Sequence, residues 1–122
     1  MPRRPSSFRD QRSAQLSSPE AIVVLFHMRH CPFCEGLPGH QGPVASAARG
    51  CQDFQVEYRE VERSTSILQQ LPEIGSDTLV KGFPTIAIVT PDGEWYSYTG
   101  ADRSEEALRG WVQYTLRVAR GR

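Results

Sequence analysis

Cys31 and Cys34 stand two residues apart in the stretch HCPFC, in a chain that has only three cysteines. Two thiols at this spacing either exchange electrons with another disulfide or bind a metal ion. The third cysteine, Cys51, makes the number odd, so the cysteines do not form a disulfide framework. In a reducing compartment a close pair is more often catalytic or metal-binding than structural. The stretch predicts a redox pair or a metal site.

The residues around Cys31 favour a thiolate. Arg29 and His30 precede it, and we expect a helix to begin near it, with Pro32 in the first turn. Helix N-terminal amides and nearby cations lower the pKa of a thiol. We therefore predict that His30 and Arg29 lower the pKa of Cys31. Cys31 then attacks as the thiolate, and Cys34 resolves the mixed disulfide.

Zinc is the alternative interpretation of the same stretch. The three histidines, His27, His30 and His40, all flank the cysteine pair. Two thiolates and two imidazoles can hold zinc in tetrahedral geometry. The chain has no second cysteine pair at the spacing of a zinc finger, and we expect His27, at the end of a strand, to point away from Cys31. We predict no bound metal.

A strand is predicted before Cys31, whereas an irregular stretch is predicted directly after Cys34. Residues 21–27, AIVVLFH, form an apolar run typical of a strand covered on both faces. The stretch after Cys34 is rich in Gly and Pro, so a continuous helix is not expected there. A helix is predicted from Pro43 to about Gly50. Alternating apolar residues predict a strand over residues 54–61.

The second half predicts two helices and a hairpin. A short helix is expected over residues 64–71, followed by a loop over residues 73–82. Residues 85–90 and 94–100 predict an antiparallel hairpin around the turn Pro91-Asp92-Gly93. Asp102 and Glu105 predict a capping box for a last helix. The apolar stripe of that helix is Leu108, Trp111, Val112 and Leu116.

Length and composition predict a single domain. The chain has 122 residues, 39% of them hydrophobic and 23% charged. We predict a flexible basic arm over residues 1–6 and one domain over residues 7–119, which begins with a short helix capped by Ser7. The formal net charge is zero, so we do not expect binding to nucleic acid. Without an apolar run of membrane length or a secretory signal, we expect a cytoplasmic protein.

Three stretches together resemble the thioredoxin superfamily, most of all thioredoxins and protein disulfide isomerase domains. AIVVLFHMRHCPFC is similar to the central strand that leads into the active-site cysteines. VKGFPTIAIV is similar to the family's Val-x-Gly-(Phe/Tyr)-Pro-Thr signature, and DGEWYSYTGADRSEEALRGWV is similar to the closing hairpin and helix. The resemblance implies an α/β thioredoxin fold, a central mixed β-sheet flanked by helices. It also implies that Pro84 is cis and lies against the cysteine pair, and that Phe83, Pro84 and Thr85 bind substrate.

The chain departs from the family's pattern at several positions. His30 replaces the Trp before the first cysteine, and Leu25 replaces the buried Asp of thioredoxins. The helix proline aligns best with Pro43, after an insertion of about four residues within GLPGHQG. The usual first strand is missing or reduced to the arm. Thr-Val-Pro and Gly-Gly signatures for glutathione are absent, so we expect no cofactor.

The combined patterns predict a thioredoxin-like protein disulfide oxidoreductase that uses its CPFC pair to reduce, form or isomerise disulfides in a protein substrate. Because residue 25 is leucine and not the buried Asp of thioredoxins, we expect a disulfide oxidant or isomerase and not a strong reductant. The alternative function is an assembly module that binds an acidic partner through Arg-rich ends. The arginines of the two ends are Arg3, Arg4, Arg9, Arg12, Arg117, Arg120 and Arg122.

The role of the third cysteine stays open in the sequence. Cys51 is either a small buried hydrophobe or an exposed thiol in addition to the pair.

Overall fold

A computed structural model of the chain describes residues 19–121. Its centre is a mixed four-stranded sheet with the order β2-β1-β3-β4. β1 pairs in parallel with β2 and antiparallel with β3, and β3 pairs antiparallel with β4. The strands are β1 (Ala21–His27), β2 (Val56–Glu62), β3 (Thr85–Val89) and β4 (Trp95–Ser97). This is the mixed α/β sheet that the sequence predicted.

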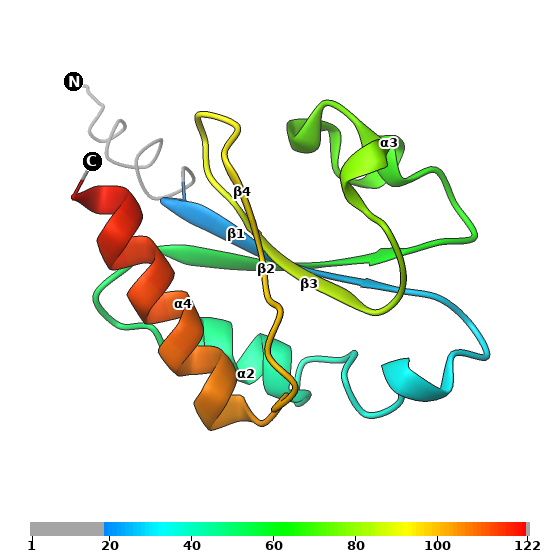
Figure 1. Cartoon of the computed structure of the whole chain (residues 1–122), viewed down its shortest axis with the longest axis horizontal. Helices are drawn as coiled ribbons and strands as arrows, with labels where there is room; N and C mark the ends of the chain where they lie inside the picture. Colours follow the sequence, from blue (N-terminus) through cyan, green and yellow to red (C-terminus); the bar gives the residue numbers. More distant parts are fainter. Residues whose placement is uncertain (1–18, 122) are drawn as a thin grey trace, which may run out of the picture.

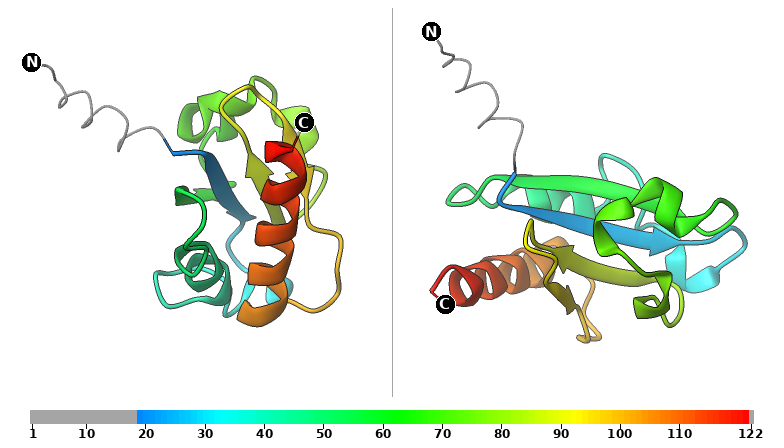
Figure 2. Two further views of the ribbon diagram at one scale, coloured as in Figure 1. Left: turned by 90° about the vertical axis from the view of Figure 1, so that its left-hand side faces the viewer. Right: turned by 90° about the horizontal axis from the view of Figure 1, so that it is seen from above.

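Helices cover both faces of the sheet (Figure 1). α2 (Pro43–Arg49) and α4 (Glu105–Arg120) pack against each other on one face. The short helix α3 (Ile67–Gln70) and the 3-10 helices η2 (Pro72–Ile74) and η3 (Asp77–Leu79) complete the connection from β2 to β3. The two views of Figure 2 place α4 and α3 on opposite sides of the sheet. The arrangement is three layers, helix, sheet and helix.

β1 is the centre of the core because its residues alternate between the two faces. Val23 and Leu25 pack into the cluster beneath α2 and α4. Val24 and Phe26 pack into a second cluster on the other face, with Leu71. All five side chains are fully buried. An apolar strand without alternation was therefore the correct signal for a doubly covered strand.

Most predicted elements are confirmed, with shifted ends. The strand predicted over residues 21–27 and the helix predicted from Pro43 form as expected. β2 begins at Val56 and not at residue 54, because Phe54 still belongs to a turn in which its backbone N–H donates a hydrogen bond to the Cys51 carbonyl at 3.4 Å. The helix expected over residues 64–71 is reduced to α3, with Ser66 as its N-cap. The predicted arm over residues 1–6 and the helix that begins at Ser7 lie outside the described residues.

The predicted cap of the last helix is wrong by two positions. α4 begins at Glu105, and its N-cap is Ser104, whose hydroxyl accepts a hydrogen bond from the Ala107 backbone N–H at 3.3 Å. Asp102 instead accepts a hydrogen bond from the Ser104 backbone N–H at 3.0 Å. The N-cap side chain must reach the third helical amide, and from this backbone Ser104 does so. Asp102 therefore orders the turn before the helix.

Within residues 19–121, the helices are all too short or too polar to cross a lipid bilayer.

Candidate functional site

The chain reverses direction between the end of β1 and the first cysteine of the pair. Met28, Arg29 and His30 form this exposed turn. Among the described residues other than glycine, His30 is the one with a left-handed backbone, at φ 58°. Histidine is one of the side chains that enter this region more often, and such strain is concentrated at functional sites. The turn places Cys31 directly beyond the edge of the sheet.

The helix expected to begin near Cys31 is reduced to a single turn. η1 (Pro32–Cys34) is a 3-10 helix of three residues, and Glu35 after it is extended. One turn is too short to sum its peptide dipoles into a helix macrodipole. The predicted helix therefore ends at Cys34, and the expectation of irregular chain between Cys34 and Pro43 is confirmed.

The second half of the site comes from the loop before β3. The Cys31 thiol donates a hydrogen bond to the backbone carbonyl of Phe83, with a sulfur-to-oxygen distance of 3.9 Å. The peptide bond between Phe83 and Pro84 is cis. The contact joins residues 52 positions apart in the chain. It brings the GFPT stretch against the first cysteine, so two motifs recognised separately in the sequence form one site.

Both thiols are free and nearly covered by protein. Cys31 is 6% exposed and Cys34 is 4% exposed, so exposure barely distinguishes the two sulfurs. They border a cavity of about 640 Å³. The cavity is lined by His27, Met28, His30, Cys31, Pro32, Cys34, Glu35, Gly36 and Pro38. The Cys31 sulfur therefore lies between this cavity and the Phe83 carbonyl.

The environment of Cys34 favours its thiol form. Burial raises the pKa of the Cys34 thiol, and a hydrogen bond with Cys31 raises it further. A hydrogen bond from the Met28 backbone N–H and the charge of Arg103 act in the opposite direction. Arg103 precedes α4 and was not among the predicted site residues, because no sequence pattern connects it with the cysteine pair.

The remaining predicted site residues differ in how they contribute. The His30 side chain lines the cavity, whereas Arg29 lies beside Glu62 and helps to lower the pKa of that carboxyl, after the larger effect of hydrogen bonds from Ser64. The Phe83 side chain packs against the core cluster around Phe26. Only the Phe83 carbonyl therefore faces Cys31.

Thr85 is partly committed to its own loop. Its hydroxyl donates a hydrogen bond to the Gly82 carbonyl at 2.6 Å. Thr85 is also the first residue of β3, where it is paired with Phe26 of β1.

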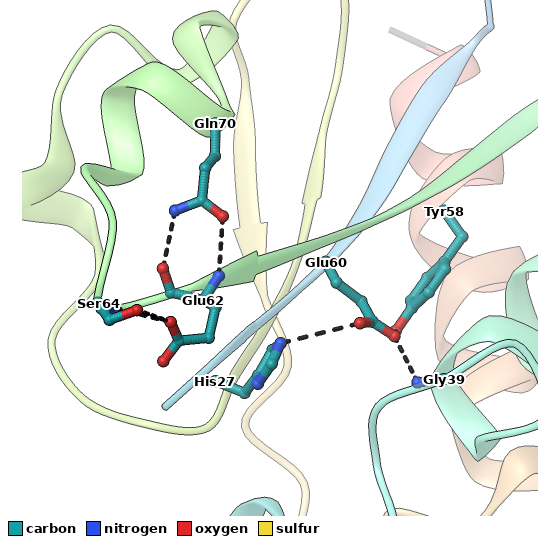
Figure 3. A network of polar contacts seen from close by, with 7 residues as sticks. All are labelled: His27, Gly39, Tyr58, Glu60, Glu62, Ser64 and Gln70. Atoms are coloured by element: carbon teal, nitrogen blue, oxygen red, sulfur yellow. Dashed lines mark hydrogen bonds and ion pairs between the residues drawn. The ribbon is translucent and has the colours of Figure 1, made fainter. Parts of the chain in front are cut away.

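A polar cluster next to the site was missed by the sequence prediction. The Glu60 carboxylate accepts hydrogen bonds from the Tyr58 hydroxyl at 2.7 Å and from the Gly39 backbone N–H (Figure 3). His27 Nε2 lies 3.8 Å from Glu60 Oε1. The expectation that His27 points away from Cys31 stays a prediction: the imidazole turns toward Glu60, and His27 borders the same cavity as both cysteines. The alternation of Tyr58 and Glu60 along β2 was the available signal, since it places both on one face.

Cys51 belongs to the core. It is 4% exposed, and its thiol donates a hydrogen bond to the Ala47 carbonyl at 3.3 Å. Burial raises the pKa of the Cys51 thiol. Of the two interpretations left open by the sequence, the small buried hydrophobe is the one that fits.

The arginine-rich ends are only partly available to a partner. Arg120 forms hydrogen bonds with both carboxylate oxygens of Glu20, at 2.7 to 2.9 Å, and lies 4.2 Å above the Phe54 ring. It therefore joins the end of α4 to the start of β1. Arg117 is exposed. The other arginines proposed for partner binding lie outside the described residues.

Within residues 19–121, histidine, cysteine, aspartate and glutamate side chains do not gather into any group of three or more suited to a metal ion. The zinc interpretation therefore has no ligand set in this part of the chain.

No protein-family model and no curated protein matches the sequence. The chain does match solved structures. The first thioredoxin domain of mouse protein disulfide-isomerase A4 aligns with a TM-score of 0.59 at 16% identity, over 92% of this chain and 71% of that one. The zinc-bound form of human ERp44 aligns with a TM-score of 0.58 at 19% identity, over 84% of this chain and 29% of that one. The first two thioredoxin domains of Saccharomyces cerevisiae Eps1p align with a TM-score of 0.53 at 19% identity, over 95% of this chain and 40% of that one.

These likenesses identify the architecture. The chain has a thioredoxin fold, as the resemblance in its sequence implied. It spans less than a third of the ERp44 chain that it matches.

Proposed function

We propose that this chain is a thiol–disulfide oxidoreductase that acts on disulfides or dithiols of a protein substrate. The observation that carries the proposal is the position of Cys31, whose sulfur lies 3.9 Å from the Phe83 carbonyl beside the cis bond to Pro84, with Cys34 in the same cavity. A free dithiol next to backbone that can pair with an extended peptide meets the requirements of disulfide exchange.

Each residue of the site has a role in this proposal. Cys31 attacks the substrate disulfide, and Cys34 displaces the substrate from the resulting mixed disulfide. Phe83, Pro84 and Thr85 hold the substrate strand through their backbone. His30 and Arg29 stabilise the Cys31 thiolate through their positive charge. His30, which lines the cavity, is the better placed of these two.

The fold and the free thiols support the redox function over an assembly role. Both thiols are free and border one cavity, and Cys31 contacts the loop before Pro84, although a scaffold needs neither thiol. An acidic partner bound through the arginine-rich ends remains compatible with redox activity. The cytoplasmic location and the domain limits expected from the sequence stay predictions.

The deciding experiment is equilibration of the full chain in glutathione buffers of graded potential, followed by thiol trapping and mass measurement. We expect one two-electron transition, in which Cys31 and Cys34 close and Cys51 stays trapped as a thiol. The midpoint then places the protein among donors or acceptors of disulfides, since a tenfold change in the equilibrium constant corresponds to about 30 mV.

Two variants control this measurement. Cys34→Ser abolishes the transition, because Cys31 then has no partner. Cys51→Ala leaves it unchanged, because Cys51 lies in the core. If the Cys31–Cys34 pair stays reduced at every accessible potential, the proposed function is wrong.

A further inference from the structure

The last residue of β1 lies at the wall of the cavity that holds both cysteines. His27 lines this cavity with Cys31 and Cys34, and its side chain is 18% exposed. The next residue, Met28, borders this cavity too, and its backbone N–H acts to lower the pKa of the Cys34 thiol. The end of β1 and the second cysteine therefore share one cavity. An imidazole is the side chain best suited to exchange protons near neutral pH.

Glu60 holds this imidazole from the neighbouring strand. Figure 3 shows the Glu60 carboxylate between His27, Tyr58 and Gly39. The hydrogen bond from Tyr58 at 2.7 Å and that from the Gly39 N–H fix the carboxylate. At 3.8 Å, the contact from Glu60 Oε1 to His27 Nε2 is longer than a hydrogen bond, so it acts as an ion pair once the ring carries a second proton. Gly39 belongs to the segment after Cys34, so Glu60 also ties that segment to β2.

We propose that His27, positioned by Glu60, accepts the thiol proton of Cys34 in the resolving step. This inference rests on the proposed function. The proton passes from Cys34 to the imidazole, and the Cys34 thiolate attacks Cys31 Sγ in the mixed disulfide. The Cys31–Cys34 bond forms as the bond between Cys31 and the substrate sulfur breaks, and the departing thiolate takes up a proton. The protein dithiol loses two electrons, and the substrate disulfide gains them.

The chemistry of Cys34 requires such an acceptor. Burial raises the pKa of its thiol, so the thiolate is scarce at neutral pH. Other charged or titratable groups border the cavity or face its residues. They are Glu60 and Glu62 from β2, Arg29 and His30 from the turn after β1, Glu35 after η1, and Arg103 before α4.

The experiment separates the two steps of exchange. The reduced full chain, carrying Cys51→Ala to remove the third thiol, reacts with oxidised glutathione between about pH 6 and 9. Acid quenching and mass measurement follow the mixed disulfide as it forms on Cys31 and then disappears. In His27→Gln we expect formation within about twofold of the parent rate and resolution slower by roughly 10²-fold near pH 7. Added free imidazole restores part of the resolution rate.

Two further variants make the result specific. Glu60→Gln keeps an oxygen for Tyr58 but removes the charge, so we expect slower resolution with a shifted pH profile. His40→Gln is the matched control, because the His40 side chain is not part of the cavity, and we expect the parent rates.

Several outcomes overturn the proton-acceptor role. These are resolution in His27→Gln at the parent rate with the parent pH profile, or slow resolution that free imidazole does not restore. If His27→Gln does not fold, an unchanged pH profile in Glu60→Gln overturns it. A parent protein that forms no mixed disulfide contradicts the proposed function itself, which is a different observation.

Discussion

Gly42 controls how the segment after Cys34 returns to the sheet, and its replacement by alanine tests that geometry. Gly42 is the N-cap of α2, with φ −72° and ψ 165°, values that alanine also adopts. An added Cβ, however, would lie deep inside contact distance of the Leu37 carbonyl oxygen and 3.0 Å from the Pro38 carbonyl oxygen. Both are backbone atoms, so the strain cannot be relieved by rotating a side chain.

The expected loss of stability follows from these contacts. The Leu37 backbone has to move, although Leu37 is 5% exposed and belongs to the core cluster beneath α2. Overpacking of this kind costs about 1–3 kcal/mol, and exchange of a glycine N-cap for alanine adds roughly 0.5–1 kcal/mol. We expect Gly42→Ala to lower the free energy of unfolding by about 2 kcal/mol.

Urea denaturation of the reduced protein measures this loss. The midpoint should fall by about 1 M, because the slope for a small domain is about 1–3 kcal/mol per molar urea. Gly82→Ala is the control, since a Cβ at Gly82 meets nothing within 4 Å, and we expect a change below about 0.5 kcal/mol. The reasoning is refuted if Gly42→Ala unfolds at the same midpoint as Gly82→Ala.

Two further predictions concern stability. Gly110 lies exposed within α4, where a Cβ meets nothing within 4 Å. Gly110→Ala should therefore raise the free energy of unfolding by about 0.5–1 kcal/mol in the same urea assay, because glycine weakens a helix interior. An unchanged or lower free energy of unfolding contradicts this. Burial raises the pKa values of Cys34, Cys51 and Tyr58, so the folded reduced protein retains these protons above the pH at which the unfolded chain releases them. The stability that these groups contribute is complete below about pH 8.5 and declines as the pH rises. Between about pH 7.5 and 10, the free energy of unfolding should therefore fall less in Cys51→Ala than in the parent protein. A stability that does not change over this range would refute the assignment.

Local patterns predicted the elements better than their ends. The apolar run of β1 needs cover on both faces, and residues 21–27 form the strand as predicted. The last helix was predicted from its apolar stripe, but its cap was misplaced from Ser104 to Asp102. Short polar side chains before a helix compete for the same amide hydrogen bonds, and the turn geometry, which no local pattern contains, decides between them.

The spacing of Cys31 and Cys34, the buried strand before them and the GFPT stretch after them were all evident from the sequence, because each depends on neighbouring residues in the chain. The folded chain adds the contact of the Phe83 carbonyl with Cys31, and it places His27 at the cavity of the two cysteines with Glu60 next to its imidazole. These contacts follow from the parallel register of β1 with β2 and the antiparallel register of β1 with β3. Register is set by packing on both faces of the whole sheet, so a local pattern does not contain it.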